Sequence, residues 1–162
     1  MEVASAEAGA LTSIKPWLQA AELLKVVTGA LIAVAVFSTT KVFRASALGL
    51  CFGLIGAGLL IAAGVLGFLA LGELGRRDGS AELGRWTALS GLASAPFTGA
   101  WAAVLLGSRV EAPKWVRLSA LALAATGLGA LLLPPIGMLF GLASIAWWFG
   151  LARLLGRTQS RS

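Results

Sequence analysis

Two long stretches of this chain contain no charged residue, and they limit what it can fold into. Residues 46–72 carry no charge, and neither do the 35 residues of 118–152. An uncharged apolar run of about 18 residues or more is the usual signature of a transmembrane helix. Hydrophobic residues make up 58% of the chain and charged residues only 12%. This composition excludes a soluble globule and a disordered chain, so we expect an all-α integral membrane protein.

The residue types that the chain lacks exclude several kinds of site. There is no histidine, so a His-ligated haem, a His-based zinc site and a histidine general base are excluded. Cys51 is the one cysteine, and its apolar surroundings are typical of a small buried hydrophobe. No nucleophile stands in a pattern with a base. We therefore expect no catalytic residue, no metal site and no cofactor, and a protein that is not an enzyme.

The apolar runs predict a bundle of four transmembrane helices within residues 19–152. An N-terminal segment, 1–18, is expected to start a helix along the membrane interface, with Ser13 as N-cap and Pro16 in the first turn. A basic tail, 153–162, follows the bundle. The spans are expected at about 19–38, 46–72, 86–107 and 117–147.

The number of spans depends on the uncharged stretch 118–152. As one helix it is long for a membrane core of about 30 Å, and as two helices it is short. Pro134-Pro135 near its middle either kinks one long, tilted helix or turns a hairpin, which gives five spans. Because the hairpin turn would hold no polar residue, we prefer the single kinked helix.

An internal repeat favours the same choice. A shift of the chain by 73 residues places Lys41 and Arg44 on Lys114 and Arg117. The match predicts two duplicated helical hairpins, in which the fourth span corresponds to the second.

Basic residues at the span ends suggest an orientation. With four spans, eight lie on the side of the termini and five on the other, which places both termini in the cytoplasm. With five spans the same counts place the N-terminus outside. The net charge of +6 is dispersed over span ends, which is typical of contact with lipid headgroups. We expect a multi-pass protein of the cell (plasma or inner) membrane that binds no nucleic acid.

One ionisable pair lies near membrane depth. Glu22 and Lys25 are three residues apart on one helical face of the first span. One interpretation is a mutually paired couple whose side chains reach toward the interface. The other is an ion or proton relay, or a contact to a partner subunit.

Small residues follow one face of the second span at helical spacing. In lipid, such residues drive helix association because they let two backbones approach closely. Packing within the chain is one interpretation, and a seam between copies is the alternative. We call this face the glycine seam, and its members are Ser46, Gly49, Gly53, Gly56, Ala63 and Gly67.

The third span carries a hydroxyl stripe, which consists of Thr87, Ser94 and Thr98. It is expected to form hydrogen bonds between helices or, alternatively, to line a narrow polar pathway. Pro96 lies within the stripe and predicts a kink. Tryptophans near span ends are expected in the aromatic belts at the membrane interfaces, namely Trp86, Trp101, Trp115 and Trp147-Trp148.

The sequence points to a non-catalytic function. We expect an accessory or assembly subunit that packs through small-residue helix faces in a larger membrane complex. Its partners would be the lipid bilayer and other membrane subunits, or further copies of itself. The alternative is a small homo-oligomeric transporter or channel that uses Glu22, Lys25 and the hydroxyl-lined helix.

Overall fold

The described part of the chain forms five helices. The computed structural model describes the backbone of residues 2–43, 46–73, 79–107, 112–133 and 135–159. Side chains are described for residues 13–43, 46–73, 81–107, 112–133 and 135–156. Each helix is long and apolar enough to cross a membrane, which confirms the expected all-helical fold. The helices are α1 (Glu2–Phe43), α2 (Ala47–Gly72), α3 (Gly79–Gly107), α4 (Lys114–Leu132) and α5 (Ile136–Gln159).

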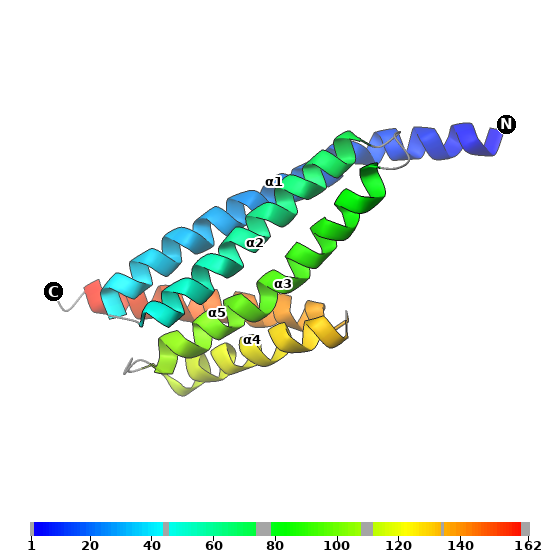
Figure 1. The fold of residues 1–162 in the computed structure, drawn as a ribbon. Coiled ribbons are helices and arrows are strands. Elements are labelled where there is room, and N and C mark those ends of the chain that lie inside the picture. Colours follow the sequence, from blue (N-terminus) through cyan, green and yellow to red (C-terminus); the bar gives the residue numbers. More distant parts are fainter. Residues whose placement is uncertain (1, 44–45, 74–78, 108–111, 134, 160–162) are drawn as a thin grey trace.

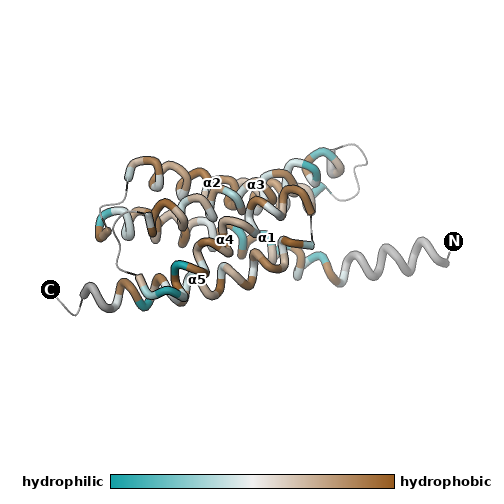
Figure 2. The backbone as a smooth tube through the Cα atoms, turned by 90° about the horizontal axis from the view of Figure 1, so that it is seen from below, coloured by the Kyte–Doolittle hydropathy of each residue, from teal (hydrophilic) through white to brown (hydrophobic). Residues whose placement is uncertain are grey.

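Consecutive helices run antiparallel, and each packs mainly on the helices before and after it (Figure 1). We call the end where α1, α3 and α5 begin end I, and the end where they finish end II. Helices α1–α3 extend further at end I than the turn between α4 and α5 does. Hydrophilic residues gather mainly near the two ends (Figure 2). Because the five helices alternate in direction, α1 begins at end I and α5 finishes at end II, so the chain starts and finishes at opposite ends of the bundle.

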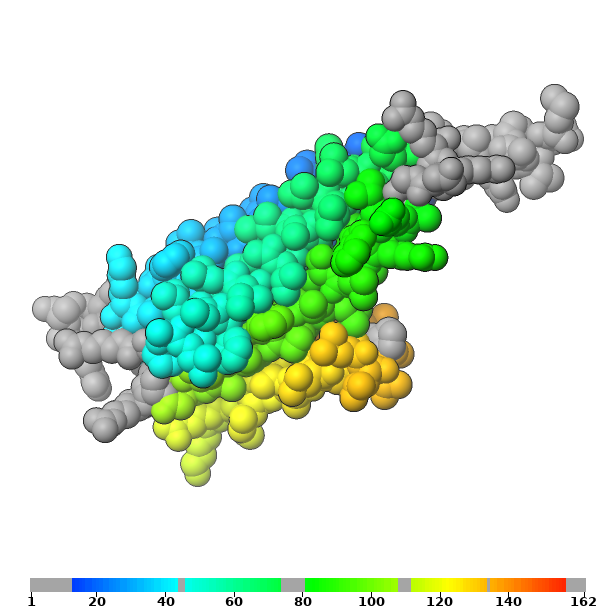
Figure 3. All heavy atoms as spheres, viewed as in Figure 1, coloured from blue at the N-terminus to red at the C-terminus, as the bar shows by residue number. Residues whose placement is uncertain are grey.

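Small residues form the fully buried contacts of α2, while its large apolar side chains are exposed or only partly buried. Every buried residue of α2 is a glycine or an alanine. Leu48, Phe68 and Leu69 of the same helix are exposed. Helices α2, α3 and α4 meet along one face of the molecule (Figure 3). This arrangement matches the packing of helices in lipid, where hiding a leucine gains little and close backbone contact gains more.

Helix α1 is longer than the sequence predicts. It begins at Glu2, so residues 2–18 of the predicted N-terminal segment are continuous with the first apolar helix. Ser13 and Pro16 lie inside this helix, and Ser13 is therefore not its N-cap. The cause is composition, because the preceding residues are rich in alanine and glutamate, which have high helix propensity.

The observed ends of α2 and α3 match the predicted span boundaries, except at the start of α3. Helix α2 covers the predicted span, and the Ser46 hydroxyl caps it by accepting a hydrogen bond from the Gly49 backbone N–H at 3.3 Å. Helix α3 ends at Gly107 as expected but begins seven residues earlier, at Gly79, than the predicted 86. Cys51 is exposed on the outer face of α2, so the expectation of a buried thiol is wrong.

The stretch 118–152 contains a chain reversal, where we predict one long kinked helix. Helix α4 ends at Leu132, α5 begins at Ile136, and the two lie side by side as an antiparallel hairpin (Figure 1). Leu133 is extended, with φ −136° and ψ 102°, which is the conformation that a following proline favours. The Ile136 N–H donates to the Leu133 carbonyl at 2.9 Å, so this turn satisfies part of its backbone without polar side chains. Pro134 itself lies outside the described residues.

The predicted 73-residue repeat is not reflected in the helix boundaries. Helix α2 begins at Ala47, whose counterpart Ala120 lies inside α4. It then continues without a break to Gly72, whereas the matching stretch crosses the turn after α4. The aligned basic residues are explained more simply, because Lys41 and Lys114 both stand at helix ends at end II.

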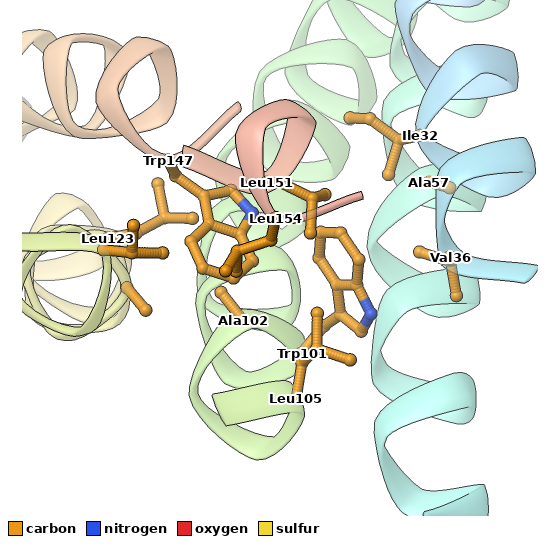
Figure 4. Packing of buried hydrophobic residues seen from close by; sticks show 12 residues of the cluster. Ile32, Val36, Ala57, Trp101, Ala102, Leu105, Leu123, Trp147, Leu151 and Leu154 are labelled. Carbon is orange, nitrogen blue, oxygen red and sulfur yellow. The ribbon is translucent and has the colours of Figure 1, made fainter. Parts of the chain in front are cut away.

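A pair of tryptophans fills the core between α3 and α5. Trp101 and Trp147 are fully buried, and their rings meet edge-on with centroids 5.9 Å apart. In Figure 4, Trp101 lies near Val36 of α1, while Trp147 lies toward Leu123 of α4. The expectation that both belong to aromatic belts is wrong, because proximity to a span end does not reveal which way a side chain faces. Trp17, Trp86 and Trp115 are the tryptophans with exposed rings.

Candidate functional site

Glu22 and Lys25 form an ion pair on α1. The Lys25 ammonium donates to Glu22 Oε1 at 2.6 Å, as the spacing of three residues on a helix allows. The Glu22 side chain is 15% exposed and that of Lys25 is 38% exposed. The carboxylate therefore lies against the protein, while the lysine reaches outward. The sequence predicts this couple correctly as a local pair.

The Glu22 carboxylate occupies a notch that glycines of α2 create. Its side chain is in close contact with Gly67, where a β-carbon would overlap the carboxylate. One turn away, a β-carbon on Gly64 would lie 2.6 Å from the Glu22 carbonyl oxygen. Glu22 Oε2 is buried and has no hydrogen-bond partner among the described residues. Oε1 accepts from Lys25, so Oε2 is the oxygen of this carboxylate that is buried without such a contact among the described residues.

The glycine seam is occupied by the chain's own helices. A β-carbon on Gly53 would lie 2.5 Å from a methyl of Val36 in α1, and one on Gly56 would lie 2.8 Å from the hydroxyl of Thr98 in α3. Gly49 faces Val104 of α3, Gly67 faces Glu22, and Ala63 is fully buried. Ser46 is exposed and serves as the cap of α2. The sequence allows packing within the chain or a seam between copies, and in the structure these glycines pack against helices of their own chain.

The hydroxyl stripe bonds to its own helix. Thr87 donates to the Leu83 carbonyl at 2.8 Å, Ser94 to Gly91 at 2.7 Å, and Thr98 to Ser94 at 2.9 Å. These are back-bonds over three or four residues, which Ser and Thr commonly form in membrane helices. Ser94 and Thr98 are buried against the neighbouring helices. The three hydroxyls therefore neither bridge helices nor line an open path.

The predicted kink positions have different outcomes. Pro96 lies inside α3, which runs as one helix from Gly79 to Gly107. Pro135 lies in the turn before α5, and Pro134 falls outside the described residues. Pro135 thus marks a chain reversal, and Pro96 marks a position within a continuous helix.

The sequence does not predict a close contact between α3 and α4 at Gly99 and Gly127. A β-carbon on Gly99 would lie 2.6 Å from the Ala124 Cα atom, and one on Gly127 would lie 2.7 Å from the Ala95 carbonyl oxygen. Both partners are backbone atoms, so the two helices touch through their main chains. Gly99 has the small residues Ala95 and Ala103 four positions away on either side, whereas Gly127 has leucines at both of these positions. Small-residue spacing could therefore have indicated Gly99 but not Gly127.

No metal-binding cluster is seen in the described ranges. No three His, Cys, Asp or Glu side chains come together there in an arrangement that could hold an ion. Comparison with known proteins finds no matching protein family, no similar curated protein and no similar solved structure. The functional interpretation therefore rests on the residues and their geometry.

Proposed function

We propose that the chain is a multi-pass membrane protein whose five helices all lie in the bilayer, with the termini on opposite sides. Helix α4 has 19 residues, or about 28 Å at 1.5 Å per residue, which just reaches across a core of about 30 Å. The turn after it is apolar, since Leu132 and Met138 are 81% and 82% exposed. An apolar turn is tolerated there because it lies at the edge of the hydrocarbon core. At the same end of the bundle, α2 and α3 extend beyond this turn, so their polar ends lie outside the core.

The distribution of charge gives the orientation. The segments at end II hold eight basic residues and one acidic residue, whereas those at end I hold five basic and six acidic residues. The side with more lysine and arginine faces the cytoplasm. End II, with the C-terminus, is therefore cytoplasmic in this proposal, and the N-terminus lies outside. This orientation replaces the four-span arrangement, in which both termini are cytoplasmic.

Within the membrane, we propose that the protein is a non-catalytic accessory or assembly subunit of a larger complex. The observation that carries this proposal is the closed interior. The glycine seam is filled by α1 and α3, and the hydroxyl stripe is bonded to its own helix. A transport path needs polar or ionisable groups along its wall. The described interior offers few, so its contacts favour a structural role.

The hairpin offers a small-residue face to another helix. Gly137 and Gly141 of α5 stand four residues apart, and nothing lies within 4 Å of a β-carbon built on either. Met138 and Leu142 beside them are exposed. GxxxG spacing allows close approach of two membrane helices. Since the seam on α2 is already used, this pair is where a partner subunit would pack.

Purification in mild detergent tests the proposal. We expect the native protein to elute with other membrane subunits, at a mass above that of the 16.5 kDa chain in its micelle. The double variant Gly137→Leu/Gly141→Leu should lose these subunits at least tenfold, because leucine holds the helices apart. Gly58→Leu is the control, since Gly58 also has open space around it but lies on α2. A homo-oligomer without other subunits would contradict the accessory function.

The buried Glu22 Oε2 atom favours one second candidate, a proton- or ion-conducting homo-oligomer. In proteoliposomes, the accessory subunit should show no ion flux above that of empty vesicles. Flux that is present in the wild type and lost in Glu22→Gln/Lys25→Met would instead support the second candidate.

A further inference from the structure

The two ends of the bundle differ in the charge of their ionisable side chains. At end II the described ionisable side chains are Lys41, Lys114, Arg117 and Arg153, all exposed and all basic. At end I, Lys15, Lys25 and Arg85 are balanced by Glu22, Glu73 and Glu82. Only end II is therefore a one-signed surface among the described residues.

An aromatic pair lies between the basic residues of end II. The rings of Trp115 and Phe149 are 6.3 Å apart, and Trp115 also packs on Gly150. Lys114 precedes this tryptophan on α4, and Arg153 follows Phe149 by one turn on α5. Both rings are exposed. The pair thus brings the cations of two helices to one edge of the bundle.

We propose that this edge, formed by Trp115, Phe149, Lys114 and Arg153, binds the headgroups of anionic phospholipids. Tryptophan prefers the headgroup level of a membrane, and lysine and arginine there attract anionic lipid. End I lacks this attraction, because its described basic and acidic side chains are equal in number. The partner is a lipid phosphate with net negative charge, since the surface offers cations and ring faces but no acidic group in its described part. The inference rests on the proposed membrane placement.

Lipid retention by the purified protein tests this proposal. The full chain is taken into detergent with equal amounts of phosphatidylglycerol and phosphatidylcholine, and bound lipid is counted by native mass spectrometry. We expect preferential retention of phosphatidylglycerol. Lys114→Gln/Arg153→Gln should reduce that preference about tenfold or more, since each surface cation contributes a factor of about five. Raising the salt concentration should weaken the preference in the wild type.

A matched variant at the other end makes the test specific. Lys15→Gln/Arg85→Gln removes the same number of charges at end I and should leave the preference unchanged. Equal losses in both variants, or no preference in the wild type, would overturn the proposal. Carbonate extraction of cell membranes is measured first for all three proteins. If the wild type itself is washed off, the membrane placement fails and the lipid site with it, whereas an integrated protein without lipid preference refutes only the lipid site.

Discussion

Gly127→Val is expected to destabilise the folded bundle by about 2 kcal/mol or more, which is in the upper part of the range for overpacked cores. The β-carbon alone would lie 2.7 Å from the Ala95 carbonyl oxygen and 2.9 Å from its carbonyl carbon. Both are main-chain atoms of α3, so no side-chain rotation can relieve the overlap. The two helices must separate, and the contact at Gly99 loosens with them.

Thermal unfolding in detergent measures this effect. For a chain of this size, about 2 kcal/mol corresponds to a fall in Tm of roughly 4–8 °C. Gly127→Ala should also lower Tm, although alanine has the higher helix propensity. Gly58→Ala is the matched control, since nothing lies within 4 Å of its β-carbon, and it should leave Tm unchanged or raise it. If Gly127→Ala stabilised the protein as Gly58→Ala does, the close contact of α3 and α4 would be refuted.

Trp101→Ala is expected to cost about 3–5 kcal/mol, the range for removing a large aromatic side chain from a packed core. Trp101 is fully buried and contacts both Trp147 and Trp148 of α5, with ring centroids 5.9 and 5.7 Å away. Its indole N–H has no partner among the described residues. Trp101→Phe should therefore be much milder, because it keeps most of the ring contacts and loses no hydrogen bond that the structure describes.

The control for this series is a tryptophan on the surface. Trp17 is 78% exposed, so Trp17→Ala should change the unfolding temperature little. Chemical unfolding in mixed micelles gives the free energies of all three variants. An equal loss for Trp17→Ala and Trp101→Ala would show that Trp101 does not hold α3 and α5 together.

Hydropathy and small-residue spacing predict much of this fold. The uncharged run 46–72 becomes α2 with Ser46 as its cap, and the glycine seam lies at helix contacts. The spacing also brings Glu22 and Lys25 together, because a pair three residues apart depends only on local helix geometry.

The contacts between distant helices are not predictable in the same way. Trp101 and Trp147 stand near span ends in the sequence, yet packing turns both inward. The notch that holds Glu22 depends on Gly67 of a different helix. The turn after α4 is missed for another reason, since we expect turns to be polar. That expectation applies to turns in water, and this one is closed by its own backbone.

The membrane arrangement has one direct test, which is the side of the bilayer on which each terminus lies. Ser5→Cys and Ser160→Cys are each introduced into a Cys51→Ala background, which removes the one native cysteine. A membrane-impermeant maleimide is then added to intact cells. Five helices in the bilayer predict labelling at residue 5, and labelling at residue 160 only after the cells are opened. Protection of both positions in intact cells, or labelling of both, would contradict the five-helix arrangement and support an even number of crossings.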